Sequence, residues 1–339
     1  MKIRPFALER FFAMHEFSVK HLACASDPDA LSVSEVLALE QGAQEKFLEL
    51  GLGYGESVGQ PDLRQAIAAL FTGIAAEDTL VHAGAQEAIF AFMHVLLGPG
   101  DHAIVHTPAY QSLYEVAESA GASVTRWEAR EVDAWQPDVD ALARLIRPET
   151  KLIVINSPHN PTGALISRDR LDAIVALARK HGLWLFGDEV YRGVEYGAPR
   201  NPSVVELYER GVSLGATAKV YGLAGLRIGW LVCRDRSLLE RVATFKDYLT
   251  ICSPLPSEFL AAIALRHAEQ LASRTRKIVE ANLPLVQRLI DERPGEFSWV
   301  KPVAGTTGFV RYLPGGAEKW ASELLAKTGV LFLPGPLFD

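Results

Sequence analysis

Residues 151–191 read KLIVINSPHNPTGALISRDRLDAIVALARKHGLWLFGDEVY. Two apolar runs in this stretch, Leu152 to Asn156 and Trp184 to Phe186, have the length of strands that are buried on both faces. Between them, Arg168 to Lys180 places apolar residues at the spacing of a helix. A strand, a helix and a second strand in this order are typical of a parallel sheet.

The same alternation of short apolar runs and helical segments extends over about residues 60–250. The further helices are expected at Pro61–Phe71, Ala85–Leu97 and Ala109–Ala120, and the further strands at Ala103–His106, Ser123–Trp127 and Leu226–Cys233. The pattern predicts an α/β fold with a mostly parallel central sheet and helices on both faces. In such folds the ligand binds in loops beyond the carboxyl ends of the strands.

The pattern changes near residue 250, where Ser253-Pro254-Leu255-Pro256 interrupts it. The segments that follow are Ser257–Asp291, expected as one long helix or two abutting ones, a strand pair within Phe297–Tyr312, and a helix at Ala317–Lys327. We therefore expect a smaller α+β domain after the sheet. The predicted division is an N-terminal segment of residues 1–45 that joins the small domain, a large cofactor-binding domain of residues 46–250, and a small C-terminal domain of residues 251–339.

Bulk composition excludes several classes of protein. The chain has 339 residues, enough for two domains, and a formal net charge of −7. Proteins that neutralise nucleic-acid phosphates carry the opposite sign, so no nucleic-acid partner is expected. The three cysteines, Cys24, Cys233 and Cys252, form no CxxC pair, and HExxH does not occur. The sequence therefore predicts neither a disulfide framework nor a metal site.

Two observations predict a cytoplasmic protein. The first ten residues, MKIRPFALER, carry charges where a secretory signal needs an apolar run. No stretch approaches the roughly 18 consecutive apolar residues of a membrane helix. We accordingly expect no membrane partner.

Four local patterns occur in a fixed order along the chain. They are His82-Ala83-Gly84-Ala85-Gln86-Glu87-Ala88, Asn156-Ser157-Pro158-His159-Asn160-Pro161-Thr162-Gly163, Gly187-Asp188-Glu189-Val190-Tyr191, and Ala218-Lys219-Val220-Tyr221-Gly222-Leu223-Ala224-Gly225-Leu226-Arg227-Ile228-Gly229. Each pattern alone is weak. In this order and at this spacing the chain, from about Tyr54 to Gly335, resembles the class I/II aminotransferases of pyridoxal-5′-phosphate (PLP) fold type I.

The resemblance implies a role for each residue at the reactive end of PLP. Lys219 would form a Schiff base with the aldehyde and, once displaced by a substrate amine, act as general base and acid at Cα. Asp188 would pair with the protonated pyridine nitrogen and keep the ring an electron sink. Tyr191 and Asn160 would reach the phenolic oxygen. Outside the motif, such a lysine is usually a surface charge and such an aspartate a helix cap or turn residue.

The resemblance also implies a phosphate site and a shared dimer. Gly84-Ala85-Gln86 opens a helix whose free N–H groups favour an anion, and Arg227 matches the arginine that binds the phosphate. Tyr110 takes the place of the aromatic residue that stacks on the pyridine ring. Tyr54 resembles the tyrosine that reaches the phosphate of the neighbouring subunit, which would make the protein a homodimer with shared active sites.

The chain departs from the family pattern in two places. Where the family usually has hydroxyl residues one and three positions before the lysine, this chain has Ala218 and Ala216. The chain also ends at Asp339, where the family continues with a strand that carries the substrate-carboxylate arginine. We therefore expect the small domain to lack its natural tail, and neither the amino donor nor the amino acceptor can be named.

The predicted function is PLP-dependent transfer of an amino group between an L-amino acid and a 2-oxo acid. A PLP-dependent lyase or amino-acid cyclase would use the same residues and is the main alternative. A PLP-binding regulator without turnover is a weaker one, because an acidic chain has no spare segment for DNA binding. A dinucleotide enzyme is disfavoured because Glu56 stands where the third glycine of GxGxxG, after Gly51 and Gly53, would lie.

Overall fold

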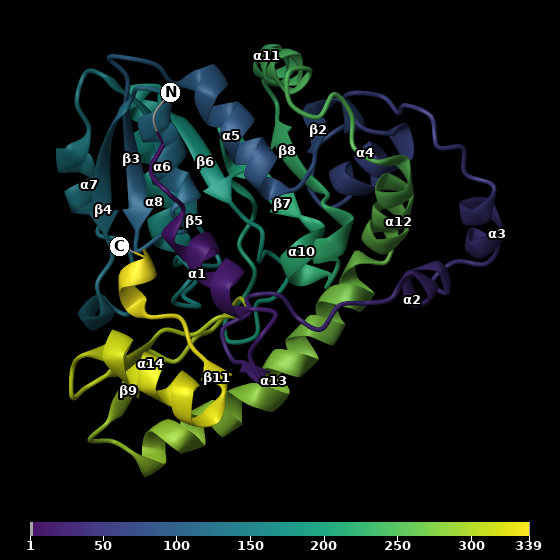
Figure 1. The fold of residues 1–339 in the computed structure, drawn as a ribbon. Coiled ribbons are helices and arrows are strands. Elements are labelled where there is room, and N and C mark those ends of the chain that lie inside the picture. Colours follow the sequence, from purple (N-terminus) through teal and green to yellow (C-terminus); the bar gives the residue numbers. More distant parts are fainter. Residues whose placement is uncertain (1–2, 339) are drawn as a thin grey trace.

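The computed structural model describes residues 3–338, so that Met1, Lys2 and Asp339, at the ends of the predicted terminal regions, lie outside it. Its centre is a seven-stranded sheet with the order β2-β8-β7-β6-β5-β3-β4 (Figure 1). The strands are β2 (Thr79–His82), β3 (His102–Thr107), β4 (Ser123–Glu128), β5 (Thr150–Asn156), β6 (Trp184–Asp188), β7 (Gly211–Ala216) and β8 (Gly229–Cys233). Only β8 runs against its neighbours in this sheet, which confirms the predicted α/β fold with a mostly parallel sheet.

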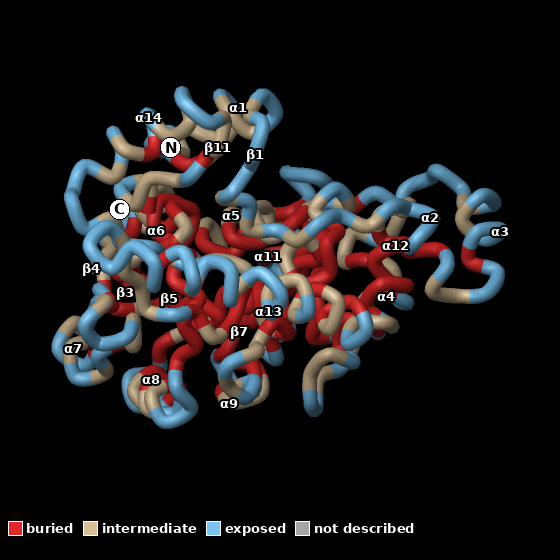
Figure 2. The backbone as a smooth tube through the Cα atoms, turned by 90° about the horizontal axis from the view of Figure 1, so that it is seen from below, coloured by how far each residue is buried: buried red, intermediate tan, exposed pale blue. Residues whose placement is uncertain are grey.

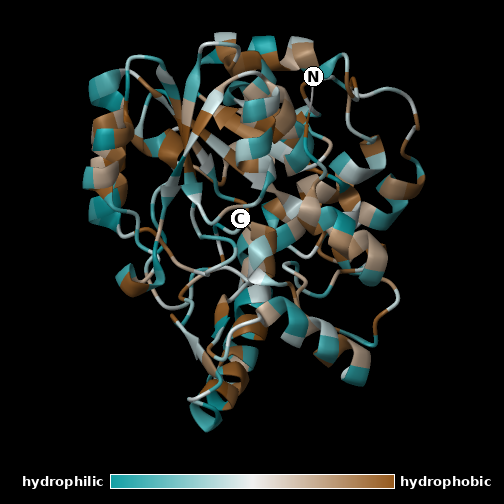
Figure 3. Cartoon of the chain, turned by 60° about the vertical axis from the view of Figure 1, so that its left-hand side comes forward, coloured by the Kyte–Doolittle hydropathy of each residue, from teal (hydrophilic) through white to brown (hydrophobic). Residues whose placement is uncertain are grey.

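The strands are apolar on both faces because both faces are covered by helices. On β5 and its neighbour β6, Val154 and Phe186 face one layer, whereas Ile153 and Leu185 face the other. The first layer contains α5 (Ala85–Leu96), α6 (Ser112–Ser119) and α11 (Arg236–Lys246), and the second contains α7 (Val139–Leu145), α8 (Arg168–His181) and α9 (Val204–Leu207). Buried residues are concentrated in the strands, and the covering helices carry both hydrophilic and hydrophobic residues (Figures 2 and 3).

The segment Ser257–Asp291, predicted as one long helix or two abutting ones, belongs to two helices, α12 (Leu255–Arg266) and α13 (Ala268–Glu292), which meet at His267. Helix α12 packs on α4 (Pro61–Ala68) and on α2 (Val33–Leu37), beyond which lies α3 (Ala43–Leu48). Helix α13 runs from there to the C-terminal elements (Figure 1).

The C-terminal elements include the predicted strand pair and helix. Strands β9 (Phe297–Trp299) and β10 (Val310–Tyr312) are antiparallel, and α14 (Ala317–Thr328) follows. Strand β11 (Val330–Leu331) pairs in parallel with β1 (His21–Leu22), which follows α1 (Ala7–His15). The N-terminal segment therefore joins the C-terminal elements, although the predicted domain boundaries themselves stay a prediction.

The sequence analysis missed β2 and β7, and β7 shows why. It contains Gly211, Ser213 and Gly215, which weaken an apolar strand pattern. Gly215 is required by packing, because a Cβ there would lie 2.4 Å from the indole of Trp230 on β8. The glycine is thus explained by a contact with the neighbouring strand β8, which the sequence of β7 alone does not reveal.

Replacing Gly215 with alanine tests this contact. We expect Gly215→Ala to lower the free energy of unfolding by about 1–3 kcal/mol, the usual cost of overpacking a core. Gly295→Ala is the matched control, because a Cβ there meets nothing within 4 Å. The measurement is urea unfolding followed by circular dichroism, and equal midpoints for the two variants would contradict the packing argument.

Candidate active site

A cavity of about 1130 Å³ opens at the carboxyl ends of the parallel strands. It brings together nearly all the residues that the sequence analysis singled out, namely Gly84, Ala85, Gln86, Tyr110, Asn160, Asp188, Tyr191, Lys219 and Arg227. Tyr54 is the exception, since it lies outside this cavity and 88% of its surface is exposed. The location agrees with the rule that ligands bind beyond the carboxyl ends of parallel strands.

Asp188 is the last residue of β6, and its carboxyl group is buried at the edge of the cavity. Burial raises its pKa to about 7, while a long hydrogen bond of 3.3 Å from the Val190 amide and the charge of Lys219 act in the opposite direction. A positively charged partner beside this carboxyl group would lower its pKa again and stabilise the ionised form.

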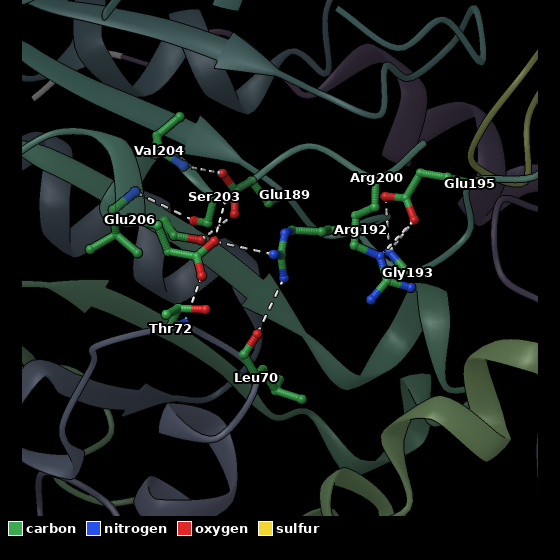
Figure 4. A network of polar contacts seen from close by, with 12 residues as sticks. Leu70, Thr72, Glu189, Arg192, Gly193, Glu195, Arg200, Ser203, Val204 and Glu206 are labelled. Carbon is green, nitrogen blue, oxygen red and sulfur yellow. Dashed lines mark hydrogen bonds and ion pairs between the residues drawn. The ribbon is translucent and has the colours of Figure 1, made fainter. Parts of the chain in front are cut away.

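The residue after Asp188 points away from the cavity and anchors the strand end. Glu189 accepts a hydrogen bond from the Val204 amide (2.8 Å; Figure 4). It accepts another from the Ser213 hydroxyl (2.6 Å). Both partners lie outside the cavity wall, on α9 and β7. These bonds fix the backbone that carries Asp188.

Arg192 anchors the other side of Tyr191 in the same way. Its guanidinium lies 3.3 Å from the Glu206 carboxylate and 3.4 Å from the Leu70 carbonyl (Figure 4). Tyr191, only 2% exposed, is thus held between fixed neighbours and lines the cavity.

Lys219 lies on α10 (Thr217–Val220), the short helix that follows β7. Burial lowers the pKa of its amine, and the carboxylates of Asp27 and Glu9 oppose this shift. The amine donates a 2.7 Å hydrogen bond to the Ser26 hydroxyl and lies 3.8 Å from the Asp27 carboxylate. A lowered pKa favours the neutral amine, which is the nucleophilic form.

An anion cradle lies at the start of α5. Gly84 caps this twelve-residue helix with a φ of 87°, and a Cβ on Gly84 would lie 2.5 Å from a terminal nitrogen of Arg227. Glycine therefore leaves room for the guanidinium beside the free N–H groups of the helix. Both features favour a bound phosphate.

Asn160 is held by a second asparagine, Asn156 at the end of β5. The Asn160 amide donates to the Asn156 side-chain oxygen (2.6 Å), and the Asn156 side-chain nitrogen donates to the Asp188 carbonyl (2.9 Å). The side-chain oxygen of Asn160 is buried and has no protein partner among residues 3–338. The backbone of Asn160 is thus fixed, and its side-chain oxygen keeps capacity for a ligand.

Tyr110 and Thr217 complete the wall of the cavity. The Tyr110 hydroxyl donates to Glu9 on α1 (2.9 Å), so the N-terminal helix lies against this aromatic residue. The Thr217 hydroxyl lies 3.2 Å from the Leu223 carbonyl and 3.2 Å from the Ile228 carbonyl. Because these backbone bonds occupy Thr217, it does not replace the hydroxyls missing at Ala216 and Ala218.

These residues fit PLP by their chemistry. The α5 cradle with Arg227 suits the dianionic phosphate, and Asp188 suits a protonated ring nitrogen. Asn160 has a side-chain amide on a fixed backbone, with a buried oxygen that has no partner among residues 3–338, and Lys219 offers an amine to an aldehyde. The cavity therefore contains a partner for each polar part of the cofactor.

Comparison with known proteins decides the family. The profile of the family "Aminotransferase class I and II" matches residues 28–339. The chain belongs to this family. It is a PLP-dependent aminotransferase of fold type I, as the resemblance of its motifs implied.

Three similar proteins illustrate the range of the family. Capreomycidine synthase of Streptomyces vinaceus is 34% identical over 289 residues, which cover 84% of this chain and 73% of that protein. Arginine–pyruvate transaminase AruH of Pseudomonas aeruginosa is 29% identical over 94% of this chain and 82% of its own. The crystal structure of a PLP-dependent aminotransferase from Streptococcus suis superposes with a TM-score of 0.94 at 34% identity, covering 100% of this chain and 91% of that one.

The sequence analysis missed three residues of the cavity, Glu9, Ser26 and Asp27. All three come from the N-terminal segment, and Ser26 is separated from Lys219 by 193 positions. No motif spacing marks them, because their position depends on how the N-terminal segment crosses the sheet edge. Within residues 3–338 no cluster of potential metal ligands occurs, and no helix is long and apolar enough to cross a membrane.

The raised pKa of Asp188 predicts how the stability of the cofactor-free protein changes with pH. The unfolded carboxyl group ionises near pH 4, whereas the folded one ionises near pH 7, so the folded state binds more protons in between. We therefore expect this group to make folding stability fall as pH rises from about 4 to 7 and then level off. Asp188→Asn should lack that contribution, and thermal unfolding at pH 5.5 and 8 measures it. The stability gained by the variant relative to wild type should be larger at pH 8, and an equal difference at both pH values would contradict it.

Proposed function

We propose that this aminotransferase moves an amino group between an L-amino acid and a 2-oxo acid, with Lys219 as the cofactor-linked and proton-carrying residue. The observation that carries the proposal is the convergence of Lys219, Asp188, Asn160 and Arg227 on one cavity at the strand ends. An amine, a buried acid, a fixed amide and an anion cradle together match the polar groups of one cofactor.

Each side chain has a distinct role in the proposal. When bound, PLP supplies an aldehyde that bonds to amines and a ring that withdraws electrons from the neighbouring carbon. Lys219 removes and returns the proton at the substrate Cα. Asp188 holds the positive charge at the ring nitrogen, while Asn160 and Tyr191 donate to the phenolic oxygen. Arg227 and the first turn of α5 bind the phosphate, and Tyr110 covers the ring.

Borohydride labelling tests the role of Lys219. We expect the purified protein to be yellow and to carry reduced cofactor on the peptide that contains Lys219, because among the lysines of residues 3–338 only Lys219 lines the proposed site. Lys219→Ala should lose the label, while Lys151→Ala, a surface lysine that binds Asp101, should keep it. Peptide mass spectrometry gives the readout, and a label on another lysine would overturn the assignment.

We further propose a homodimer with shared active sites. Several large apolar residues outside the cavity are strongly exposed, namely Leu48 (76%), Leu52 (84%), Tyr54 (88%) and Tyr248 (89%). Such residues are normally covered in the functional protein when they cluster. Because Tyr54 does not line the cavity of its own chain, we propose that its hydroxyl binds the phosphate in the other subunit.

A cytoplasmic location and the domain boundaries at residues 45 and 250 also stay predictions.

Subunit mixing tests the shared site. Tyr54→Phe should weaken PLP retention by about ten- to a hundredfold without unfolding the chain, since it removes one hydrogen bond to a charged group. Mixed dimers of Tyr54→Phe and Lys219→Ala chains contain one site with both changes and one with neither. Activity and cofactor retention should therefore return, up to one intact site per mixed dimer. If mixed dimers form and neither readout returns, Tyr54 does not act across the interface.

Cyclisation of an amino acid is the second candidate function. A specific observation that favours it is the 34% identity to a protein named capreomycidine synthase. The two functions differ in their products: transfer yields a new amino acid from pyruvate or 2-oxoglutarate, whereas cyclisation needs no 2-oxo acid. Incubation with L-arginine, L-aspartate and L-phenylalanine, each with and without pyruvate, separates them by mass spectrometry.

A further inference from the structure

The amine of Lys219 is in contact with a segment far away in the sequence. Its nitrogen donates a 2.7 Å hydrogen bond to the Ser26 hydroxyl, and this is the shortest contact that the amine makes among residues 3–338. Ser26 lies between β1 and α2 and is only partly exposed, within the wall of the cavity. The bond therefore joins the N-terminal segment directly to the proposed reactive nitrogen.

Ser26 is itself held from the C-terminal side of the cavity. The Thr306 hydroxyl donates a 2.5 Å hydrogen bond to the Ser26 carbonyl. Gly305, next to Thr306, donates a backbone hydrogen bond to the Val194 carbonyl (2.8 Å). A Cβ on Gly305 would lie 3.8 Å from the ring of Tyr191. Ser26 thus has a backbone anchor that is independent of its side chain.

The residues after Ser26 are bonded to the loop that follows Lys219 and to helix α13. The Leu31 amide donates to the Gly222 carbonyl (3.1 Å), and Arg274 donates to the Asp29 carbonyl (2.9 Å). These bonds, together with that of Thr306, hold the backbone of the Ser26 segment beside the backbone that carries Lys219.

The Ser26 hydroxyl has a second polar neighbour in Tyr191. Burial raises the pKa of the Tyr191 phenol, and hydrogen bonding with Ser26 acts in the opposite direction. A hydroxyl both accepts and donates, so one serine serves the Lys219 amine and the Tyr191 oxygen together. Asp27, at 3.8 Å, would stabilise only the charged amine, whereas a neutral hydroxyl holds either form.

We propose that Ser26 is a positioning residue that fixes the Lys219 amine for proton transfer at the substrate Cα. The inference rests on the proposed function of Lys219. A lysine has four rotatable bonds, and proton transfer is efficient only when the donor and acceptor atoms are within hydrogen-bond reach. The hydrogen bond to Ser26 restricts the free amine to one direction. Thr306 in turn holds the Ser26 backbone, so the position of the C-terminal elements affects that of the amine.

Three serine variants test the proposal. Ser26→Ala removes the hydroxyl and leaves the carbonyl that binds Thr306, Ser26→Thr keeps a hydroxyl, and Ser18→Ala is the control. Ser18 lies in the same N-terminal segment, and its hydroxyl contacts only the nearby His15 carbonyl among the described residues. Thermal unfolding of each variant checks that the fold is kept.

Turnover supplies the first readout. With an amino acid that the wild type accepts, Ser26→Ala should lower kcat by at least about tenfold and change KM by less than about threefold, because positioning acts on the reacting atoms. The isotope effect on kcat with the same amino acid deuterated at Cα should rise, since proton transfer becomes the slower step. Ser26→Thr should recover most of kcat, and Ser18→Ala should match the wild type.

Cofactor capture supplies the second readout and needs no substrate. Chains stripped of cofactor are mixed with PLP, and borohydride-trapped label on Lys219 is measured over time by mass spectrometry. Ser26→Ala should capture PLP at least about fivefold more slowly, because its amine is no longer held in one direction. Thr306→Val, which frees the Ser26 carbonyl, should slow capture in the same direction by a smaller factor.

The outcomes separate this inference from the proposed function. If wild-type Lys219 takes no label, the proposed function itself is wrong. If wild-type Lys219 is labelled but Ser26→Ala captures PLP and turns over within twofold of wild type, with an unchanged isotope effect, only the role of Ser26 is overturned. If Ser26→Thr fails to restore both readouts while its melting temperature is normal, the hydroxyl is not the group that acts.

Discussion

One side-chain amide, that of Asn156, holds the carboxyl edge of the sheet together. Its nitrogen donates to the Asp188 carbonyl at the end of β6, and its oxygen accepts from the Asn160 amide in the following turn. Asn156 is 2% exposed, so neither bond can be replaced readily by water. Because a buried polar group left unpaired costs about 1–3 kcal/mol, this asparagine strongly favours the one geometry that satisfies both partners. The placement of the acid and of the fixed amide in the cavity follows from it.

Burial acts in opposite ways on the pKa values of two ionisable groups that line the cavity, Asp188 and Lys219. It raises the pKa of Asp188 and lowers that of Lys219, so both groups are pushed toward their neutral forms. A ligand that brings positive charge to Asp188 and an electrophile to Lys219 relieves both costs at once. The Arg227 guanidinium needs an anion of its own at the start of α5. The cavity is thus electrostatically arranged for a ligand with separated charges, which is the nature of PLP.

The sequence predicted the sheet and the cofactor side of the site because both depend on local signals. Apolar runs marked β5 and β6, and Asp188 is the last residue of β6. The roles of Asp188, Asn160 and Lys219 came from the order and spacing of the four local motifs. The sequence did not predict β7, whose glycines are explained by contact with Trp230 on the paired strand. It also missed Ser26, because nothing near residue 26 indicates that the segment reaches a lysine 193 positions away. Tyr54 was assigned by resemblance alone, and its large exposure leaves its partner outside the single chain.

The two sides of the cavity differ in how firmly they are built. Asp188, Asn160 and the start of α5 are extensions of strands and helices whose side chains fill the cores on both faces of the sheet. The N-terminal wall depends instead on separate polar contacts, Glu9 with Tyr110, Thr306 with Ser26, and Ser26 with Lys219. A hydrogen bond between neutral groups contributes about 0.5–1.5 kcal/mol to stability and one to a charged group about 1.5–3 kcal/mol, so the wall is held more weakly than the sheet edge, whose side chains fill two cores. A rigid cofactor side and a weakly held opposite wall suit an enzyme that keeps its cofactor through many turnovers while substrates enter and leave. The Lys219 amine is the point where the two meet, since its backbone belongs to the rigid side and its nearest polar partner to the other.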